Sequence, residues 1–264
     1  MEHIESEAEF TWKQFKFVLK LPWLLLLIFI GRRSWRELLQ PLRDLLVFFF
    51  EPRATMLLIL AIIAVYIYQV FFMTEELFRQ LVFEPRNVLE GNVFPMMASW
   101  FLHANFVHLL GNIIALAVFG RIVERKLGSW QLLSIYFGAA IISDLIAAIF
   151  GQGGIGASGA IAGLISTAIL INPFYLTHFL FGIPLPAMLI GWAMMITDIM
   201  GVLVPKNDNI GHIAHLGGYM ATAFLVFLFN QEERKKMKRG LIINVLFVAS
   251  AGALWFWLRF QNIV

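Results

Sequence analysis

Long apolar stretches separated by short polar segments dominate this chain. Seven of them approach the roughly 20 apolar residues that an α-helix needs to cross the hydrocarbon core of a bilayer. The fourth is short and ends at Asn172-Pro173, and the fifth contains Pro184, Pro186 and Gly191. The pattern predicts helices over residues 54–73, 106–122, 130–150, 158–171, 184–204, 212–229 and 241–258.

The composition indicates the same class of protein. Of the 264 residues, 60% are hydrophobic and 14% are charged, which leaves too little polar surface to cover a soluble globule of this size. We therefore expect an all-α polytopic membrane protein. The net charge is +3, but the basic residues lie beside apolar stretches, where they indicate topology and contact with anionic lipids instead of nucleic acid. Because cysteine is absent, disulfides, thiolate nucleophiles and Cys-based metal sites are excluded.

Lysine and arginine gather in clusters that fall on one side of the membrane if the predicted helices alternate. By the positive-inside rule that side is cytoplasmic, which puts the N-terminus inside and both Ser158 and His215 near the outer face. Since Met1 to Phe10 lacks the pattern of a signal peptide, we expect a multi-pass protein of a prokaryotic inner (plasma) membrane. The clusters are Arg32, Arg33, Arg36, Arg43 and Arg53, then Arg121, Arg125 and Lys126, and finally Arg234, Lys235, Lys236, Lys238 and Arg239.

Two apolar segments ahead of the first span, Phe17 to Ile30 and Leu38 to Phe50, are interrupted by charges and a proline. We expect helices that lie in the cytoplasmic interface, with an additional span as the alternative. Residues 74–105, here called the outer loop, are rich in aromatic residues and are expected to be structured and partly immersed. The expected division is a cytoplasmic or interfacial segment over 1–53, a membrane core over 54–230, and a basic cytoplasmic loop with the seventh helix over 231–264.

Candidate chemistry first appears at the start of the fourth helix, in Gly156-Ala157-Ser158-Gly159. The positive end of the helix dipole and the unpaired backbone N–H groups around Ser158 favour an oxyanion there. Gly156 and Gly159 allow the backbone and a substrate to approach closely. The alternative is an N-cap followed by small packing residues, which is common in membrane helices.

A histidine at the start of the sixth helix supplies the other half of a serine hydrolase. His215, Gly218 and Thr222 are spaced i, i+3 and i+7, so they share one helix face that can pack against Gly159 and Gly163. That packing would bring His215 to Ser158. His212 is the competing base, which we interpret as a loop-facing residue because it lacks the small residues beneath it.

A third element lies at the start of the second helix. His108 and Asn112 are four residues apart, hence on one helix face, and both can donate to a developing oxyanion. An interhelical hydrogen bond is the equal alternative for these two residues. For His103 we favour a loop anchor.

Together these elements resemble the rhomboid family of intramembrane serine proteases. The resemblance covers residues 54–230, and it implies a rhomboid-like six-helix core followed by a C-terminal seventh transmembrane helix. The family pattern H-x(4)-H-x(3)-N is met by His103, His108 and Asn112, G-x-S-G by Gly156, Ser158 and Gly159, H-x-x-G by His215 and Gly218, and G-x(3)-E-x(3)-G by Gly120, Glu124 and Gly128.

The resemblance implies a serine endopeptidase that cleaves transmembrane segments of other membrane proteins near their outer end. Ser158 would be the nucleophile, His215 its general base, and the N–H of Ser158 with His108 and Asn112 the oxyanion hole. No cofactor and no metal are implied, and the partners are transmembrane substrates and the lipid bilayer. Gly156 would accompany the oxyanion hole, and the structural positions near the site are His103, Glu124, Gly159 and Gly218.

Two positions depart from the family pattern. Ala162 stands where many rhomboids carry an aromatic residue that packs on the catalytic histidine, so His215 must be oriented by another group, such as Tyr219 or an aromatic residue of the outer loop. Thr222 replaces a glycine but is still small. No carboxylate orients the histidine in this family, so we interpret Asp144 and Asp198 as water-exposed or paired groups near the outer helix ends in preference to a third triad member.

Three other functions compete with proteolysis. A rhomboid-like pseudoprotease would bind membrane proteins without cleaving them, but such relatives lack the serine or the histidine. A metal protein could use His103, His108, His212 and His215, yet the chain has no H-E-x-x-H motif. A small-solute transporter would place Asp144 and Asp198 along its pathway, and the lack of a recognisable inverted repeat argues against it.

Overall fold

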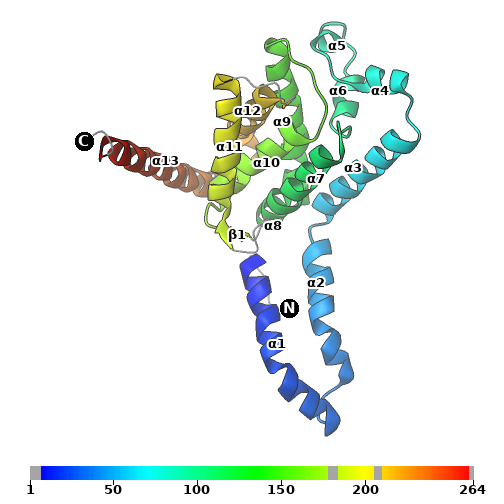
Figure 1. The fold of residues 1–264 in the computed structure, drawn as a ribbon, viewed down its shortest axis with the longest axis vertical. Helices are drawn as coiled ribbons and strands as arrows, with labels where there is room; N and C mark the ends of the chain where they lie inside the picture. Colours follow the sequence, from blue (N-terminus) through cyan, green and yellow to red (C-terminus); the bar gives the residue numbers. More distant parts are fainter. Residues whose placement is uncertain (1–6, 178–183, 205–209, 262–264) are drawn as a thin grey trace.

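The computed structural model describes residues 7–177, 184–204 and 210–261, and helices make up most of this part of the chain (Figure 1). The expected all-α polytopic fold is confirmed, with a helix at each of the seven predicted positions. They are α3 (Arg53–Phe71), α7 (Phe106–Ala115) continued by η2 (Leu116–Gly120) and α8 (Arg121–Leu127), α9 (Ser129–Ile149), α10 (Ser158–Ile171), α11 (Ala187–Leu203), α12 (His212–Phe224) continued by η3 (Leu225–Leu228), and α13 (Gln231–Gln261).

Helix α10 is the centre of the bundle, in contact with α9, α11, α12 and α13. Every residue from Gly159 to Ile169 is buried, which explains why this helix is apolar on all sides. Its 14 residues make a rod of about 21 Å, shorter than the roughly 30 Å hydrocarbon core. A central helix of this length cannot reach both surfaces of the bilayer, so one of its ends lies below the surface.

Four helices in the described residues are long and apolar enough to cross a membrane. They are the helices at Arg53–Phe71, Phe106–Leu127, Ser129–Ile149 and Gln231–Gln261, and the shorter apolar helices are α10, α11 and the continuous segment His212–Leu228.

The N-terminal segment folds into two long helices below the bundle (Figure 1). Helix α1 (Glu7–Phe29) starts well before the predicted Phe17 and runs through Pro22, whereas η1 (Trp35–Leu39) and α2 (Gln40–Phe50) match the second prediction. The stacked rings of Phe10 and Phe48 lie 4.4 Å apart, and an ion pair of 3.1 Å joins Lys13 to Asp44. These contacts hold α1 against α2.

The outer loop is structured, as predicted, and contains α4 (Glu75–Leu81), α5 (Pro85–Leu89) and α6 (Phe94–Ser99). Phe83 and Gly154 form an isolated antiparallel bridge, in which Gly154 N donates to Phe83 O over 2.9 Å and Phe83 N donates to Gly154 O over 3.2 Å. Gly156 N donates to Ser99 O over 2.8 Å. The outer loop is therefore tied directly to the segment that leads into α10.

The fifth helix starts later than predicted, at Ala187. Pro184 precedes it, and Pro186 belongs to the short strand β2 (Leu185–Pro186), which pairs with β1 (Leu176–Thr177). Gly191 is a close-packing position, because a Cβ there would lie 2.8 Å from the side chain of Ile169. These residues anchor the start of α11 and its contact with α10.

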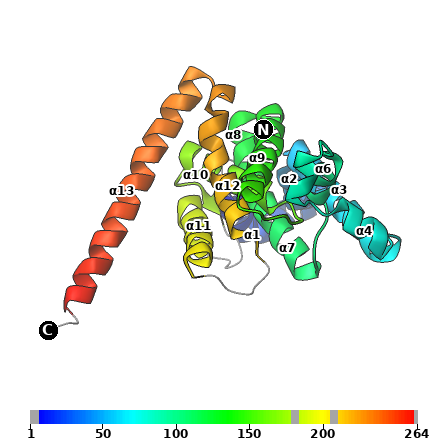
Figure 2. The ribbon, with the colours of Figure 1, turned by 90° about the horizontal axis from the view of Figure 1, so that it is seen from above.

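The basic segment after residue 230 is helical, which makes the predicted loop wrong. It forms the first turns of α13, whose buried residues are Met237, Gly240 and Asn244. Asn244 Nδ2 donates to Ile169 O over 2.9 Å, and Trp192 Nε1 donates to Asn244 Oδ1 over 2.7 Å. Beyond these contacts α13 projects away from the bundle (Figure 2).

Candidate active site

A cavity of about 820 Å³ opens at the end of the bundle where α10 and α12 begin and α11 ends. Ser158 of α10 and His215 of α12 both line it, together with His108 and Asn112 of α7. Four residues that the sequence singled out from three separate motifs therefore face the same space.

Ser158 is the first residue of α10, and it follows Gly156, whose φ of +121° is open to glycine and rarely adopted by other residues. A Cβ on Gly156 would lie 2.7 Å from His108 Cε1 and 3.8 Å from Ser158 Oγ. The histidine ring thus covers the glycine next to the serine. The N-terminal position puts Ser158 at the positive end of the dipole of α10.

The predicted contact between the small residues of α10 and α12 is present. A Cβ on Gly218 would lie 2.1 Å from Gly159 O, so the two backbones touch. One turn further on, Thr222 Oγ1 donates to Gly163 O over 3.2 Å and is 2.5 Å from Ser166 Oγ. This contact fixes the helix that carries His215 against the helix that begins at Ser158.

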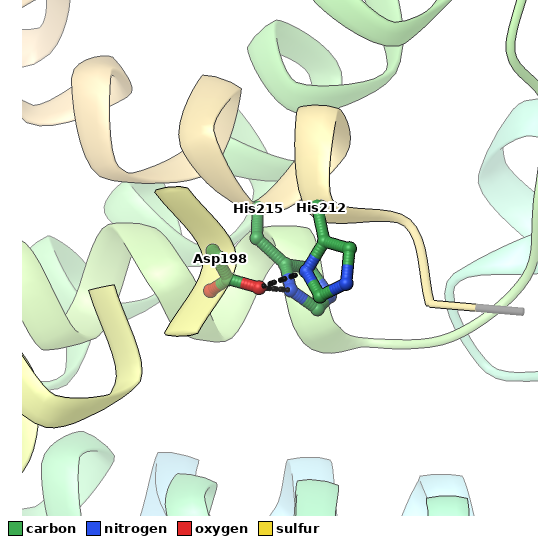
Figure 3. A group of neighbouring side chains, drawn as sticks. All are labelled: Asp198, His212 and His215. Carbon is green, nitrogen blue, oxygen red and sulfur yellow. Dashed lines mark hydrogen bonds and ion pairs between the residues drawn. The ribbon is translucent and has the colours of Figure 1, made fainter. Parts of the chain in front are cut away.

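His215 is oriented by a carboxylate. Its Nδ1 is 2.7 Å from Asp198 Oδ1, and Nδ1 of His212 is 2.8 Å from the same oxygen (Figure 3). His212 is buried, so the interpretation of this residue as loop-facing is wrong. It packs over Gly201, where a Cβ would lie 2.2 Å from His212 Nε2.

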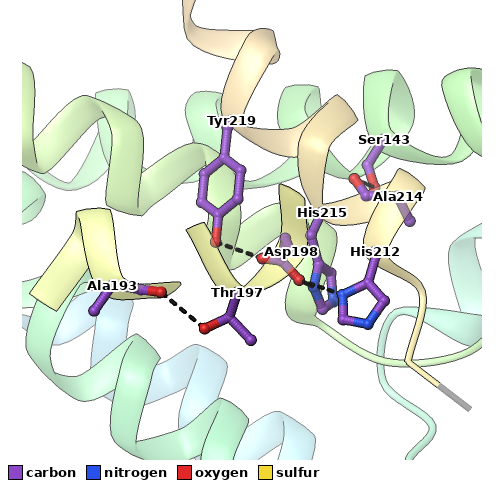
Figure 4. A network of polar contacts seen from close by, with 8 residues as sticks. All are labelled: Ser143, Ala193, Thr197, Asp198, His212, Ala214, His215 and Tyr219. Atoms are coloured by element: carbon purple, nitrogen blue, oxygen red, sulfur yellow. Dashed lines mark hydrogen bonds and ion pairs between the residues drawn. The ribbon is translucent and has the colours of Figure 1, made fainter. Parts of the chain in front are cut away.

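Asp198 also binds the residue suggested as an orienting group for His215. Tyr219 Oη donates to Asp198 Oδ2 over 2.9 Å (Figure 4). The three donors to this carboxylate, His212, His215 and Tyr219, are spaced i, i+3 and i+7 on α12, and this spacing is the signal in the sequence that could have revealed a shared acceptor on a neighbouring helix.

Asp198, His212 and His215 also form a group whose potential metal-ligating atoms lie within 4.8 Å of one another. Ligands of one tetrahedral zinc ion stand roughly 3.3 Å apart, because each is about 2.0–2.1 Å from the metal. The two Nδ1 atoms are closer than this to Oδ1, at 2.7 and 2.8 Å. These distances are those of hydrogen bonds to a carboxylate.

On α7, Ala104 N donates to His108 Nδ1 over 3.4 Å, which leaves Nε2 as the protonated nitrogen of a neutral ring. Nε2 is 2.9 Å from the position of a Cβ on Gly156, so this N–H points toward the turn that precedes Ser158. Asn112 Nδ2 donates to His108 O over 2.9 Å, which uses one of its two hydrogens. The other hydrogen is available to a group in the cavity.

His103 lies next to the site without lining the cavity. Its backbone N–H donates to Gln69 Oε1 over 3.0 Å, and its carbonyl accepts from Gln69 Nε2 over 2.7 Å. Its ring lies 5.1 Å from that of His108. Burial, followed by the charge of His108, lowers the pKa of His103 to about 4, so the ring is neutral at pH 7.

Glu124 is remote from the cavity and caps α3. Its carboxylate accepts hydrogen bonds from Ala54 N (2.9 Å), from Thr55 N (2.8 Å) and from the hydroxyl of Thr55 (2.7 Å), and Ser129 Oγ lies 2.6 Å away. An anionic side chain at a helix N-terminus is stabilised by the free N–H groups and by the dipole. Glu124 thereby joins α8 to the start of α3.

Asp144, the other acidic residue noted in the sequence, has a different partner. Its Oδ2 accepts from Trp100 Nε1 over 2.7 Å, which joins α9 to the residue that follows α6. Asp144 is thus paired through the outer loop, whereas Asp198 is paired through the histidines of α12.

The fold and the site define a polytopic helical membrane protein with a serine and a histidine on the wall of one internal cavity. The family model described as the Rhomboid domain matches residues 90–232, which contain every residue of the cavity named above. The chain belongs to the rhomboid family.

Relatives of the chain include proteins of plants, bacteria, a fission yeast and Toxoplasma gondii. It is 29% identical over 213 residues to "RHOMBOID-like protein 12, mitochondrial" of Arabidopsis thaliana, covering 73% of this chain and 61% of the relative. It is 30% identical over 156 residues to the "Putative rhomboid protease YdcA" of Bacillus subtilis, covering 57% and 74%. It is 29% identical over 229 residues to the "Rhomboid protease AarA" of Providencia stuartii, covering 73% and 78%.

The matched region covers only part of some relatives. It covers 61% of the length of "RHOMBOID-like protein 12, mitochondrial" and 47% of the length of "RHOMBOID-like protein 5", both of Arabidopsis thaliana.

Proposed function

We propose that this chain is an intramembrane serine endopeptidase in which Ser158 is the nucleophile and His215 its general base. The observation that carries the proposal is that both residues line one cavity, on helices whose backbones touch at Gly159 and Gly218. Two relatives bear names of rhomboid proteases, which supports the same activity.

In the proposed reaction His215 Nε2 accepts the proton of Ser158 Oγ as this oxygen attacks the carbonyl carbon of the scissile peptide bond. The tetrahedral intermediate then expels the amine, which receives the proton from His215. Water hydrolyses the acyl-enzyme with His215 again as base. One peptide bond and one water are consumed, and one new carboxyl terminus and one new amino terminus are formed.

The negative charge on the tetrahedral intermediate requires hydrogen-bond donors. We assign three donors to this role from residues that line the cavity: the backbone N–H at Ser158, the Nε2–H of His108 and the second Nδ2 hydrogen of Asn112. In an environment of low dielectric constant such preorganised donors stabilise an oxyanion far more than they do in water. Gly156 leaves the room that the His108 ring needs.

The proposed substrates are transmembrane segments of other proteins. A helix hides its carbonyl groups in i to i+4 hydrogen bonds, so a substrate must unwind locally before Ser158 can attack it. Small residues and helix breakers lower the cost of that unwinding. We expect cleavage near the outer end of the substrate helix, since the positive-inside rule, applied to the basic clusters, predicts that the cavity faces away from the cytoplasm. A prokaryotic inner membrane stays a prediction.

We further propose that the substrate enters between α7 and α11, because both helices contribute to the lining of the cavity, through Val107 and Met194 respectively. The chain has no native cysteine, so cysteines introduced at these two positions can be crosslinked without background. We expect the crosslinked protein to lose cleavage and a reducible crosslinker to restore it on reduction. Full cleavage in the locked protein would contradict entry by this route.

The activity is tested with a tagged single-span substrate that has a small residue at its outer helix end, in liposomes. Wild type should form product, and Ser158→Ala and His215→Ala should form none. His212→Ala should still form product, because His215 keeps its own bond to Asp198. Labelling of wild type but not of Ser158→Ala by a fluorophosphonate probe would identify the nucleophile independently of the substrate.

Product from Ser158→Ala would overturn the serine mechanism. Absence of both product and probe labelling in wild type, with substrate still bound, would assign the chain to the pseudoproteases.

A further inference from the structure

The proposed reaction of Ser158 and His215 assigns no role to Asp198. Its side chain is only 8% exposed, and every donor it binds comes from α12, although Asp198 itself lies near the end of α11 (Figure 4). A buried carboxylate without partners would be costly, and here hydrogen bonds to three side chains compensate for its desolvation.

We propose that Asp198 is a positioning residue that acts on catalysis through His215, so that the site works as an Asp–His–Ser triad. This inference rests on the proposed function of Ser158 and His215. It adds a carboxylate that the family resemblance does not imply.

The bond to Asp198 decides which ring nitrogen of His215 carries the proton. A neutral imidazole has one N–H donor and one acceptor nitrogen, and an ionised carboxylate can only accept. The bond of 2.7 Å to Asp198 Oδ1 therefore puts the proton on Nδ1. Nε2 is left with a lone pair, which is the form that a base for Ser158 needs.

The same carboxylate favours the reaction after proton transfer. When His215 takes the proton of Ser158, it becomes an imidazolium ion inside a membrane core, where an isolated charge is costly. Asp198 lies in direct contact with Nδ1 and offsets that charge. The acid thus contributes more to the transition state than to the ground state, which is the condition for a rate effect.

Asp198 is held firmly enough to orient a ring. Oδ2 is fixed by the hydroxyl of Tyr219 at 2.9 Å, while Oδ1 is bound by both histidines. Ala162 cannot supply the aromatic packing that orients the histidine in many rhomboids. Its methyl group instead lies 2.8 Å from the position of a Cβ on Gly218, within the contact between α10 and α12. The hydrogen bond that His215 donates to Asp198 on α11 replaces that packing.

The test compares Asp198→Asn with Asp144→Asn in the full-length protein in liposomes. Both changes replace a carboxylate by an amide of the same shape. Asp198 is buried and Asp144 is half-buried, but Asp144 is bonded to Trp100 and not to a histidine. We expect Asp198→Asn to lower kcat roughly 10²–10⁴-fold, as loss of the orienting carboxylate does in serine proteases, with KM changed less than about threefold. Asp144→Asn should keep kcat within about threefold of wild type.

A second measurement separates orientation from a purely structural effect. Nitrogen-15 NMR of histidine-labelled protein reports which ring nitrogen carries the proton, and the signals of His215 are assigned by their loss in His215→Ala. We expect protonation at Nδ1 in wild type and a shift toward Nε2 in Asp198→Asn. A folded Asp198→Asn protein with wild-type kcat, or with the wild-type protonation of His215, would overturn the proposal.

Two further outcomes would point to a metal site or to failure of the proposed protease function. Loss of activity with EDTA and its recovery with Zn²⁺ would reassign Asp198, His212 and His215 to a metal site, and thereby overturn the positioning role. Failure of the proposed protease function would appear as cleavage by Ser158→Ala or as no cleavage by wild type. The NMR experiment needs no substrate, so it still decides whether Asp198 sets the protonation of His215.

Discussion

The backbone of Gly218 lies directly on that of Gly159, so that a methyl group on residue 218 would stand 2.1 Å from the carbonyl oxygen of residue 159. Gly218→Ala therefore forces α12 away from α10, which moves His215 relative to Ser158. A displacement of about 1 Å can cost roughly 100-fold in rate, and we expect a loss of that order in cleavage of the transmembrane substrate.

The matched control is Gly252→Ala on α13. A Cβ on Gly252 meets no atom within 4 Å, and alanine has the higher helix propensity. This variant should cleave at the wild-type rate. Equal activity of Gly218→Ala and Gly252→Ala would show that the contact between α10 and α12 does not control the site.

Gly156→Ala should abolish most activity for a different reason. The new methyl group would lie 2.7 Å from the ring of His108, and φ at this residue is +121°. Displacement of the ring removes one oxyanion donor, for which we expect a loss of at least about 100-fold in kcat. Gly151→Ala tests backbone strain alone, because φ is +70° there and nothing lies within 4 Å. Comparable losses in the two variants would contradict a specific role of the His108 ring.

Glu124→Gln should lower stability without a direct effect on chemistry. The amide group would face N–H donors of Ala54 and Thr55 that now bind a carboxylate. We expect a loss of roughly 3 kcal/mol, measured as a lower Tm in detergent. Glu232→Gln is the control, because its side chain is 73% exposed, and it should stay within about 0.5 kcal/mol of wild type. An unchanged Tm in Glu124→Gln would rule out the capping role.

Asn244→Leu should loosen the seventh helix. The change removes the acceptor of Trp192 Nε1 and the donor to Ile169 O, which leaves a half-buried and a buried polar group without their present partners. A cost of about 2 kcal/mol is expected, seen as a lower Tm and as faster proteolysis at the start of α13. Val248→Leu, at an exposed position of the same helix, should behave as wild type. Proteolysis at equal rates would contradict this anchoring contact.

The sequence predicted the helices well because an apolar stretch in a membrane protein has few alternatives to a helix. It was less accurate where polar and apolar residues mix. Helix α1 extends to Glu7 because charged residues are compatible with a helix that contacts α2 through Phe10 and Lys13, a tertiary contact that no local pattern reveals. The basic residues after position 230 likewise continue a helix, for which lysine and arginine have high propensity.

The cavity residues were also found from local motifs, since Ser158, His108 and His215 each lie at the start of a helix. No local motif identified the hydrogen-bond partner of His215. Asp198 comes 17 residues before it, on another helix, and the number of residues between them says nothing about the rotation of α11. His212 was misplaced for the same reason, because its burial depends on Gly201 of α11.

The bridge between Phe83 and Gly154, with the hydrogen bond from Gly156 to Ser99, joins the outer loop to the chain just ahead of Ser158. If the proposed function holds, we expect a substrate helix that contacts the outer loop to displace the turn ahead of Ser158 as well. Substrate binding at the outer loop and the alignment of Ser158 are thereby coupled. Substitutions in residues 83–99 are expected to change the turnover number as well as substrate access to the cavity.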